Sequence, residues 1–523
     1  MVPGWSEATI GELIGSAGLF VNGDWIETKD QDPDGEVRLI QLTDIGDGTF
    51  LNRSHRFLSL PTADRLGCTF LQEGDLLVAR MPDPLGRATI FPGDEHRSVT
   101  SIDVCIIRAG QSRVNHRWLM WTINSPAIRQ SIAALQRGTT RTRISRRNLA
   151  AIKVPVPPSV EQERIVAEID KQFTGLDAAV GALKRAKANL NRYRAAVLKA
   201  ACEGRLVPTE AELARREGRS YEVGEQVLAR ILKERRANWE AHQLARMHTA
   251  GKLPKNDDWK KKYGEPTSPD TTHLPRPPEG WAWVSLDQVF FMRRGLFSVR
   301  PRNDPRYFGG PHPFVQIGDL PRDGGTIKNC QRTLNEKGLL VSKMFPRGSM
   351  LMAIAGDTIA NTGILSSDSC CPDSMVGLQS ENGPLLSFAE AYLTSTKLAL
   401  RRASYASGGQ PNINLAMLRS YPLPLPPEAE QSRIVMELQR ILSTVDALQE
   451  TVSCRTLAAD RLRQSILKRA FEGKLVPQDP KDESASVLLE RIRIERQMPK
   501  KKSNIPEHHR PKENQLVALA KAN

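Results

Sequence analysis

The chain has 523 residues, of which 40% are apolar, and its 74 Lys and Arg against 59 Asp and Glu give a formal charge of +15. That length favours three or four structural units of roughly 100–200 residues, and the basic excess favours a nucleic-acid partner first and an anionic membrane surface second, over a merely soluble basic protein. No apolar run approaches the roughly 18 residues of a membrane span, the N-terminus lacks a signal-peptide pattern, and seven scattered cysteines indicate a reducing cytosol.

The sequence contains two copies of one pattern. The segment from Ile144 matches the segment from Ile413 at a constant shift of 269 residues, and the match runs without a gap for about 65 residues. A second match, Gly4-Trp5 with Gly280-Trp281, opens each copy at a shift of 276 residues. Because the shift changes between the two matches, loop insertions lie between them, and the copies span about 1–270 and 271–523.

Each copy opens with a variable front domain. Short apolar or β-branched runs between Gly and Pro turns predict strands at Leu76–Met81, Val99–Ile107 and Met350–Ala355. The stretches Trp118–Leu135 and Phe388–Arg402 are typical of helices that would close each domain. The fronts are therefore predicted to be compact, strand-rich and mixed.

Each copy closes with a long helical arm. The proline run at 154–158 ends the first front domain, and Ser159 with Gln162 forms an approximate capping box. Apolar residues then recur every seven positions and predict an antiparallel or parallel coiled coil of some 40 residues, roughly 60 Å long, rather than a helix packed on its own domain. The seam in the first copy is Ile169, Leu176, Leu183, Leu190 and Val197, and in the second copy Leu438, Val445, Val452, Ala459 and Ile466.

Each arm ends in an EGRLVP or EGKLVP motif. Gly204 and Gly473 are predicted helix stops, and a shorter helix follows each, at Val223–Arg236 and at Ala485–Arg496. Residues 251–278 have linker composition, and the lysines at 500–502 favour a mobile, solubilising tail.

The motifs of common enzymes are missing from the sequence. There is no phosphate-binding GxxxxGK[ST] loop, no Pro-Pro-aromatic methyltransferase loop, no clustered His and Cys for zinc, and no nucleophile elbow. We therefore interpret the chain as a binding protein and not as an enzyme.

The ordered features, present twice, resemble the specificity (S, HsdS) subunit of Type I restriction–modification enzymes. The carrying residues are the two Gly-Trp starts, the proline-rich exits with Glu-Gln (Pro155–Gln162 and Pro424–Gln431), the Arg-Ile-Val stretches, and the two EGxLVP helix ends. The resemblance covers nearly the whole chain. The first copy departs from it at GTTRTRI, from Gly138, where the second copy has the more typical GGQPNI, from Gly408.

The resemblance implies an α+β fold in which two tandem target recognition domains are separated by long paired helices that form an antiparallel coiled coil with pseudo-twofold symmetry. The expected domains are 1–154, 155–272, 273–421 and 422–523. It also implies a cytoplasmic prokaryotic protein that reads the two halves of a split DNA site, roughly one helical turn or about 34 Å apart. Two methyltransferase subunits and endonuclease/translocase subunits would be its partners, and AdoMet, ATP and Mg²⁺ would bind to those subunits.

Base readout needs Arg, Asn or Gln side chains, and positioning needs Lys or Arg on phosphates. The densest basic cluster of the first front domain lies on a Gly-marked loop; a solvated basic turn is the alternative. Its residues are Arg137, Thr139, Thr140, Arg141, Arg143, Arg146 and Arg147, with Arg80 and Arg87 as further candidates. In the second domain the candidates are Arg293, Arg294 and Arg300 around Gly295, and Gln410, Asn412 and Asn414 on the equivalent loop.

Since amides in the second loop replace arginines in the first, the two halves should prefer different bases, adenine for amides and guanine for Arg. Trp5 and Trp281 are more consistent with core packing than with base stacking. Two other functions remain open at this point: a self-sufficient DNA-modifying enzyme with an unrecognised active site, and a basic scaffold that does not bind DNA.

Overall fold

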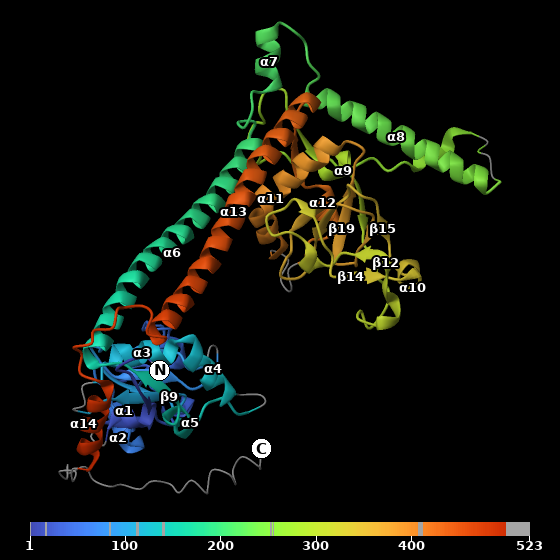
Figure 1. The fold of residues 1–523 in the computed structure, drawn as a ribbon. Helices are drawn as coiled ribbons and strands as arrows, with labels where there is room; N and C mark the ends of the chain where they lie inside the picture. Colours follow the sequence, from blue (N-terminus) through green and yellow to red (C-terminus); the bar gives the residue numbers. More distant parts are fainter. Residues whose placement is uncertain are drawn as a thin grey trace. The chain divides into compact units, whose positions relative to one another are not determined.

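The computed structural model describes residues 2–15, 18–82, 85–110, 114–138, 142–251, 254, 256–405 and 412–497. The chain divides into two compact units (Figure 1). Unit 1 joins both ends of the sequence, Met1–Leu183 and Cys454–Asn523, and unit 2 is the continuous stretch Lys184–Ser453. The lysines at 500–502 lie outside the described residues. In the described ranges, no helix is apolar over a length sufficient to cross a bilayer.

The front domain of unit 1 holds three small sheets. A four-stranded antiparallel sheet has the order β2-β8-β5-β6, a three-stranded sheet has the order β4-β3-β7 with β3 and β7 parallel, and β1 pairs antiparallel with β9. The strands are β1 (Ser6–Thr9), β2 (Leu19–Asn22), β3 (Val37–Ile40), β4 (Phe57–Leu58), β5 (Leu76–Ala79), β6 (Ala88–Ile90), β7 (Arg97–Thr100), β8 (Val104–Arg108) and β9 (Lys153–Val156).

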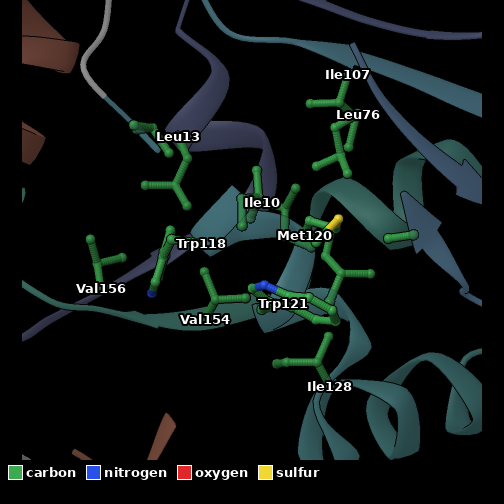
Figure 2. Close-up of a cluster of buried hydrophobic side chains, with 14 of the residues drawn as sticks. Ile10, Leu13, Leu76, Ile107, Trp118, Met120, Trp121, Ile128, Val154 and Val156 are labelled. Atoms are coloured by element: carbon green, nitrogen blue, oxygen red, sulfur yellow. The ribbon is translucent and has the colours of Figure 1, made fainter. Parts of the chain in front are cut away.

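Short helices connect and cover these strands, and their apolar faces build the core of unit 1. Figure 2 shows Trp118, Met120 and Trp121 in one apolar cluster with Leu76 and Ile107 of the four-stranded sheet, with Met120 nearest to these two. The helices are α1 (Ile10–Ile14), α2 (Leu60–Leu66), α3 (His116–Asn124), α4 (Pro126–Ala134) and α5 (Arg146–Ala150).

The front domain of unit 2 repeats the plan with larger sheets. A five-stranded sheet has the order β11-β19-β16-β17-β13, a four-stranded sheet has the order β14-β12-β18-β15, and β10 pairs antiparallel with β20. The strands are β10 (Ala282–Ser285), β11 (Phe291–Arg294), β12 (Phe308–Phe314), β13 (Thr326–Ile327), β14 (Arg332–Leu334), β15 (Met344–Phe345), β16 (Met350–Ala353), β17 (Thr362–Leu365), β18 (Ser369–Cys370), β19 (Met375–Gln379) and β20 (Pro422–Leu425). Its helices are α9 (Leu286–Val289), α10 (Glu336–Leu340), α11 (Gly383–Tyr405) and α12 (Leu415–Arg419).

Most of the predicted elements are confirmed, with two differences. The run Val99–Ile107 is two strands, β7 and β8, because a turn at residues 102–103 interrupts it. The helical stretch from Trp118 is divided into α3 and α4 because Pro126 starts a new helix. In the second copy, the equivalent stretch is one uninterrupted helix, α11.

The two arms are single helices of 44 residues each, α6 (Ser159–Cys202) and α13 (Glu428–Phe471) (Figure 1). They run antiparallel within each unit: in unit 1, Arg463 pairs with Asp177, and in unit 2, Arg194 pairs with Asp446 while Gln449 Nε2 donates to Asn191 Oδ1 over 2.7 Å. At the shift of 269 residues, the first ion pair is the exact counterpart of the second. All ten predicted seam residues are buried or half-buried, which confirms the coiled coil.

The end of α6 packs on the front domain of unit 2, and the end of α13 packs on the front domain of unit 1. Gly204 and Gly473 adopt left-handed backbone with φ of 67° and 68°, as predicted for helix stops. A Cβ on Gly204 would lie 2.9 Å from Pro278 Cγ, and a Cβ on Gly473 would lie 2.7 Å from Val2 Cγ2. These glycines therefore permit close packing as well as the turn.

A shorter helix after each arm then docks on the same front domain. In unit 2, α8 (Gly224–Thr249) begins where the Gly224 amide donates to the Gly280 carbonyl, 2.7 Å away. In unit 1, α14 (Ala485–Gln497) begins where the Ala485 amide donates to the Gly4 carbonyl, 3.0 Å away. The helix α8 extends 13 residues beyond the predicted end at Arg236, and α7 (Glu210–Glu217) precedes it.

The two tryptophans of the Gly-Trp starts are buried, 6% exposed each, as predicted. Trp5 Nε1 donates to Glu161 and Trp281 Nε1 donates to Glu430, both over 3.0 Å. Burial raises the pKa of both carboxyl groups above the ordinary value, while these hydrogen bonds oppose the shift. Each front domain is thus fastened to the first turn of its own arm by a buried indole–carboxyl pair.

The structure also moves the expected domain boundaries. The cuts at 154 and 421 leave strand β9 divided and strand β20 outside its domain, since Pro155, Pro422 and Pro424 lie in these strands. Prolines are tolerated there because each strand has a single neighbour and does not need all of its amide donors. The front domains therefore end at Val156 and Leu425.

Candidate nucleic-acid interface

The loop predicted to contact DNA in the first front domain is closed at its base by two arginines. Arg137 and Arg143 form an antiparallel bridge, with amide-to-carbonyl distances of 3.0 and 2.9 Å. Both side chains are exposed, and within the described part of the chain neither guanidinium makes a hydrogen bond or an ion pair. Thr139, Thr140 and Arg141, which lie between them in the sequence, are outside the described residues.

The next two arginines start helix α5. Ser145 caps this helix by accepting from the Asn148 amide over 3.1 Å. Arg146 Nη1 donates to the Phe20 carbonyl over 3.1 Å and stays exposed, and Arg147 is exposed without a side-chain partner among the described residues. The cap and the bridge together fix the backbone from which these cationic side chains project.

The charges of this front domain are strongly segregated along the sequence. Residues 1–103 contain eight Lys and Arg and seventeen Asp and Glu, whereas residues 104–154 contain ten Lys and Arg and no acidic residue. Four of these ten are ion-paired: Arg108 with Asp75, Arg117 with Asp170, Arg129 with Asp47, and Lys153 with Glu7.

The remaining described cations of that stretch are the loop residues Arg137, Arg143, Arg146 and Arg147, and none of them has a carboxylate partner in the described ranges. The front domain as a whole is nearly neutral, so its positive potential gathers at this loop. This segregation of charge can be counted in the sequence, and it marks the loop in addition to the local clustering of arginines.

Two further arginines predicted to contact DNA have structural surroundings. Arg80 is 9% exposed, and its guanidinium donates to the carbonyls of Ile144 and Ile102 over 3.1 and 2.8 Å. Arg87 is half-buried and donates to the Leu42 carbonyl over 3.2 Å. These bonds hold the loop base and a neighbouring turn in place, so the structure gives no support to base contact by Arg80 or Arg87.

The equivalent loop of the second front domain shares one backbone hydrogen bond with the first, and its bridge has a different partner. Asn412, at the place of Arg143, bridges to Ala355, and the Ile413 amide donates to the Ile354 carbonyl over 2.9 Å. Asn412 is exposed, whereas Asn414 Oδ1 caps helix α12 by accepting from the Met417 amide over 2.8 Å. Asn414 therefore does what Ser145 does in the first copy, and its Oδ1 is not available to a base. Gln410 lies outside the described residues.

A second cationic cluster lies around Asp373. Arg302 donates to its carboxylate at 2.7 and 3.0 Å, Arg300 lies 3.6 Å from it, and Arg294 Nε donates to its backbone carbonyl over 2.5 Å. These three side chains are exposed, and Asp373 orients two of them through its carboxylate and the third through its backbone carbonyl. The sequence analysis did not single out Arg302, because Asp373, the residue that orients its side chain, is 71 residues away in the sequence.

Arg293 differs from its neighbours in this cluster. It is half-buried, its Nη2 donates to the Met344 carbonyl over 3.1 Å, and its guanidinium lies 4.9 Å from the centre of the Phe345 ring. The contact with the ring restricts the orientation of this guanidinium group. The described residues contain no group of three or more His, Cys, Asp or Glu side chains placed to hold a metal ion.

The comparisons with known proteins agree with this arrangement. Residues 278–453 match the family model of the Type I restriction modification DNA specificity domain. The chain is 24% identical over 369 residues to the EcoDI specificity subunit of Escherichia coli, covering 69% of this chain and 72% of that protein. It is 22% identical over 390 residues to the EcoKI specificity subunit of E. coli K12, covering 71% and 70%.

The chain is thus similar to Type I specificity subunits, and residues 278–453 match the DNA specificity domain model.

The fold of this chain also has a solved counterpart. A chain from a structural study of complex assembly and conformational transition of the type I R-M system aligns with a TM-score of 0.60 at 18% identity, covering 90% of this chain and 99% of that one. This likeness confirms the α+β fold of strand-rich domains and long paired helices.

Proposed function

We propose that this chain is the DNA-reading subunit of a Type I restriction–modification complex and that each front domain contacts one half of a bipartite target. The observation that carries the proposal is the loop of the first front domain, where Arg137, Arg143, Arg146 and Arg147 project without carboxylate partners. Exposed guanidinium groups of this kind bind phosphates and guanine edges. The second front domain offers Asn412, Arg294, Arg300 and Arg302 in place of them, so the two half-sites differ.

The arms are the proposed docking surface for two methyltransferase subunits, with which endonuclease/translocase subunits would assemble. Large apolar residues remain exposed on α13, among them Met436 at 63%, Leu457 at 59% and Leu462 at 51%. A helix in a soluble assembly exposes such residues where a partner covers them. The chain itself would be non-catalytic and act in the prokaryotic cytoplasm, and AdoMet, ATP and Mg²⁺ would bind to the partner subunits.

Methylome sequencing of cells with and without this chain tests the proposal. A split motif methylated only when the chain is present is the expected result, and an unchanged methylome would contradict it. Methyl transfer by the purified chain alone, which we do not expect, would favour the self-sufficient enzyme. A basic scaffold that does not recognise DNA would show no salt-dependent binding to duplex, whereas phosphate contacts give a steep dependence.

A further inference from the structure

Unit 2 contains a groove of about 1140 Å³ that the DNA-reading function does not use. Its walls come from the end of α6, residues 191–205, from the proline-rich segment 274–278, from residues 322–323, and from residues 392–401 of α11. Trp283 Nε1 donates to the Pro275 carbonyl over 2.9 Å, which fastens the proline-rich wall to the front domain. The groove is therefore built from elements that the fold holds in place.

The rim of this groove is cationic. Arg276 and Arg322 are exposed and have no side-chain partner among the described residues. Lys397 Nζ and Arg401 Nη2 donate to backbone carbonyls, of Arg322 and Asp357, over 2.9 Å each. Burial, and then the charge of Arg401, lowers the pKa of Lys397. Cations that repel one another in this way create a local potential that an anionic ligand would stabilise.

Acidic residues in the lining do not cancel this charge. Glu203 is already paired with Arg205 and, at 3.8 Å, with Lys199. Asp323 is the other carboxylate of the lining. The four cations Arg276, Arg322, Lys397 and Arg401 therefore face one acidic side chain.

Between these charges the groove is apolar. Leu198 and Tyr392 are buried in its floor, and Leu398 on the exposed face of α11 is 69% exposed at its edge. Large apolar side chains at this exposure are isolated on many surfaces, but here Leu398 adjoins a concave apolar lining. The ligand that fits combines anionic groups with at least one large apolar group.

The floor leads into a smaller cavity of about 360 Å³, and Arg194 lines both. Arg194 is 9% exposed, and although it pairs with Asp446, its buried Nε has no hydrogen-bond partner in the described chain. In unit 1 its counterpart Arg463 lies 4.6 Å from the centre of the Phe173 ring, which meets Trp121 edge-on. The position of Phe173 is occupied in unit 2 by Leu442, which lines the smaller cavity. A leucine thus stands in the second copy where the first copy has an aromatic ring.

We propose that this groove binds an acidic segment of a partner polypeptide that inserts a large apolar side chain over Leu198 and Tyr392. A volume above the roughly 300–1000 Å³ of small-molecule pockets suits a peptide segment. Duplex DNA would use the cations but not the apolar floor, and the chain's own end, with Lys500, Lys501 and Lys502, has the wrong charge. The proposal goes beyond DNA reading and does not depend on which bases are read.

Fluorescence anisotropy with the full chain tests the proposal directly. The ligand is a fluorescein-labelled peptide of Glu, Leu and Phe residues, compared with the same peptide carrying Gln for Glu and with one carrying Ala for Leu and Phe. We expect the first peptide to bind and the other two to bind at least about tenfold more weakly, because each lacks one of the two recognised features.

The double variant Arg276→Glu/Arg322→Glu should weaken binding of the Glu-containing peptide by about tenfold or more. Both side chains are exposed and free of internal partners, so folding should be unaffected. Arg347→Glu/Lys337→Glu is the matched control: the same charge change at exposed, unpartnered positions of unit 2 outside the groove. Leu398→Ala should weaken binding through the apolar contact alone.

Three results would overturn the proposal. The first is equal binding of the Glu and Gln peptides, or no binding of either. The second is equal loss in the groove variant and in the control variant. The third is a duplex oligonucleotide that displaces the peptide and loses affinity in Arg276→Glu/Arg322→Glu but not in the control, which would make the groove a nucleic-acid track. Unchanged duplex affinity in the groove variant is the expected result and separates this site from DNA reading.

Discussion

The surroundings of an arginine decide whether it holds the fold together or meets a ligand. Arg80 and Arg143 lie beside the same loop, yet the first is buried among backbone carbonyls and the second projects without a partner. In the second copy, Ile354 occupies the place of Arg80, accepting a hydrogen bond from Ile413 as Arg80 does from Ile144. Because the second copy has an apolar residue there, we assign this position to the edge of the hydrophobic core.

Substitution separates these two roles. Arg143→Ala should leave the thermal midpoint of unit 1 unchanged and weaken binding to one half-site by about 1–3 kcal/mol, with a shallower salt dependence. Arg80→Ala should lower the midpoint, since two buried carbonyls lose their donors at about 1 kcal/mol or more. Half-site binding by anisotropy and differential scanning fluorimetry measure both. Equal weakening of the two half-sites by Arg143→Ala would contradict the assignment.

The sequence marks the loop arginines because they lie close together along the chain. It also marks Arg80 as a DNA contact, because the carbonyl groups that bind its side chain are distant in the sequence. Arg80 bonds to carbonyls 22 and 64 residues away, and Asp373 orients Arg302 from 71 residues away. Only the folded chain brings these groups together. The positive charge of the first front domain gathers at one loop and not over the domain as a whole.

The buried pair of Trp5 and Glu161 predicts a pH dependence. Burial raises the pKa of Glu161, so the folded state holds a proton at pH values where the unfolded state has lost it, and stability falls as pH rises through that window. Glu161→Gln removes this loss and keeps an oxygen for the indole. Its thermal midpoint relative to the parent should therefore be higher at about pH 7 than at about pH 4.

Two comparisons control that experiment. Glu161→Ala leaves the Trp5 N–H without its partner and should cost about 1–3 kcal/mol at both pH values. Glu430→Gln, at the equivalent pair with Trp281, should reproduce the effect in unit 2. A midpoint difference between Glu161→Gln and the parent that stays constant with pH would show that the carboxyl does not titrate in this window.

At the scale of elements, the arms are defined by their seam and by their ends. The seven-residue repeat predicts the helices and the coiled coil because it is local to each arm. It does not predict that the end of each arm packs on the front domain of the opposite copy, since that contact depends on Gly204 meeting Pro278 and on Gly473 meeting Val2. The sequence shows these glycines only as helix stops.

Alanine at these helix ends measures the two roles of glycine separately. Gly218, which ends α7 with φ of 64°, has nothing within 4 Å of an added Cβ, so Gly218→Ala should cost only the left-handed backbone term, about 1 kcal/mol. Gly204→Ala adds a clash with Pro278 and should cost more. Thermal midpoints of the two variants give the difference, and equal losses would show that the packing adjusts freely.

At the scale of the whole molecule, the proposed reading of a split target rests on the internal repeat. The two front domains present Arg on one loop and Asn on the equivalent loop, and α6 and α13 each run continuously from one unit into the other. The repeat, its halves and the arms are all visible in the sequence. The sequence does not show that unit 1 is assembled from both ends of the chain, because α14 contacts α1 and β1, which are far from it in the sequence.

If the arms set the distance between half-sites, lengthening both should lengthen the recognised spacer. We insert one heptad after Asn191 in α6 and one after Leu448 in α13, where Asn191 and Gln449 face each other, so that the seam stays in register. Seven residues add about 10 Å, which corresponds to about three base pairs. Methylation mapping reads the spacer, and an unchanged spacer would rule out the arms as its determinant.

The division of unit 1 between the two ends of the chain orders events on the ribosome. All of unit 2, Lys184–Ser453, is synthesised before Ile466, Leu488 and Ile492, which complete the core of unit 1. At bacterial or eukaryotic elongation rates that interval lasts on the order of tens of seconds. The nascent front domain must therefore keep an apolar surface open for the end of its own chain, and a premature stop codon in the last segment would damage the first domain that was made.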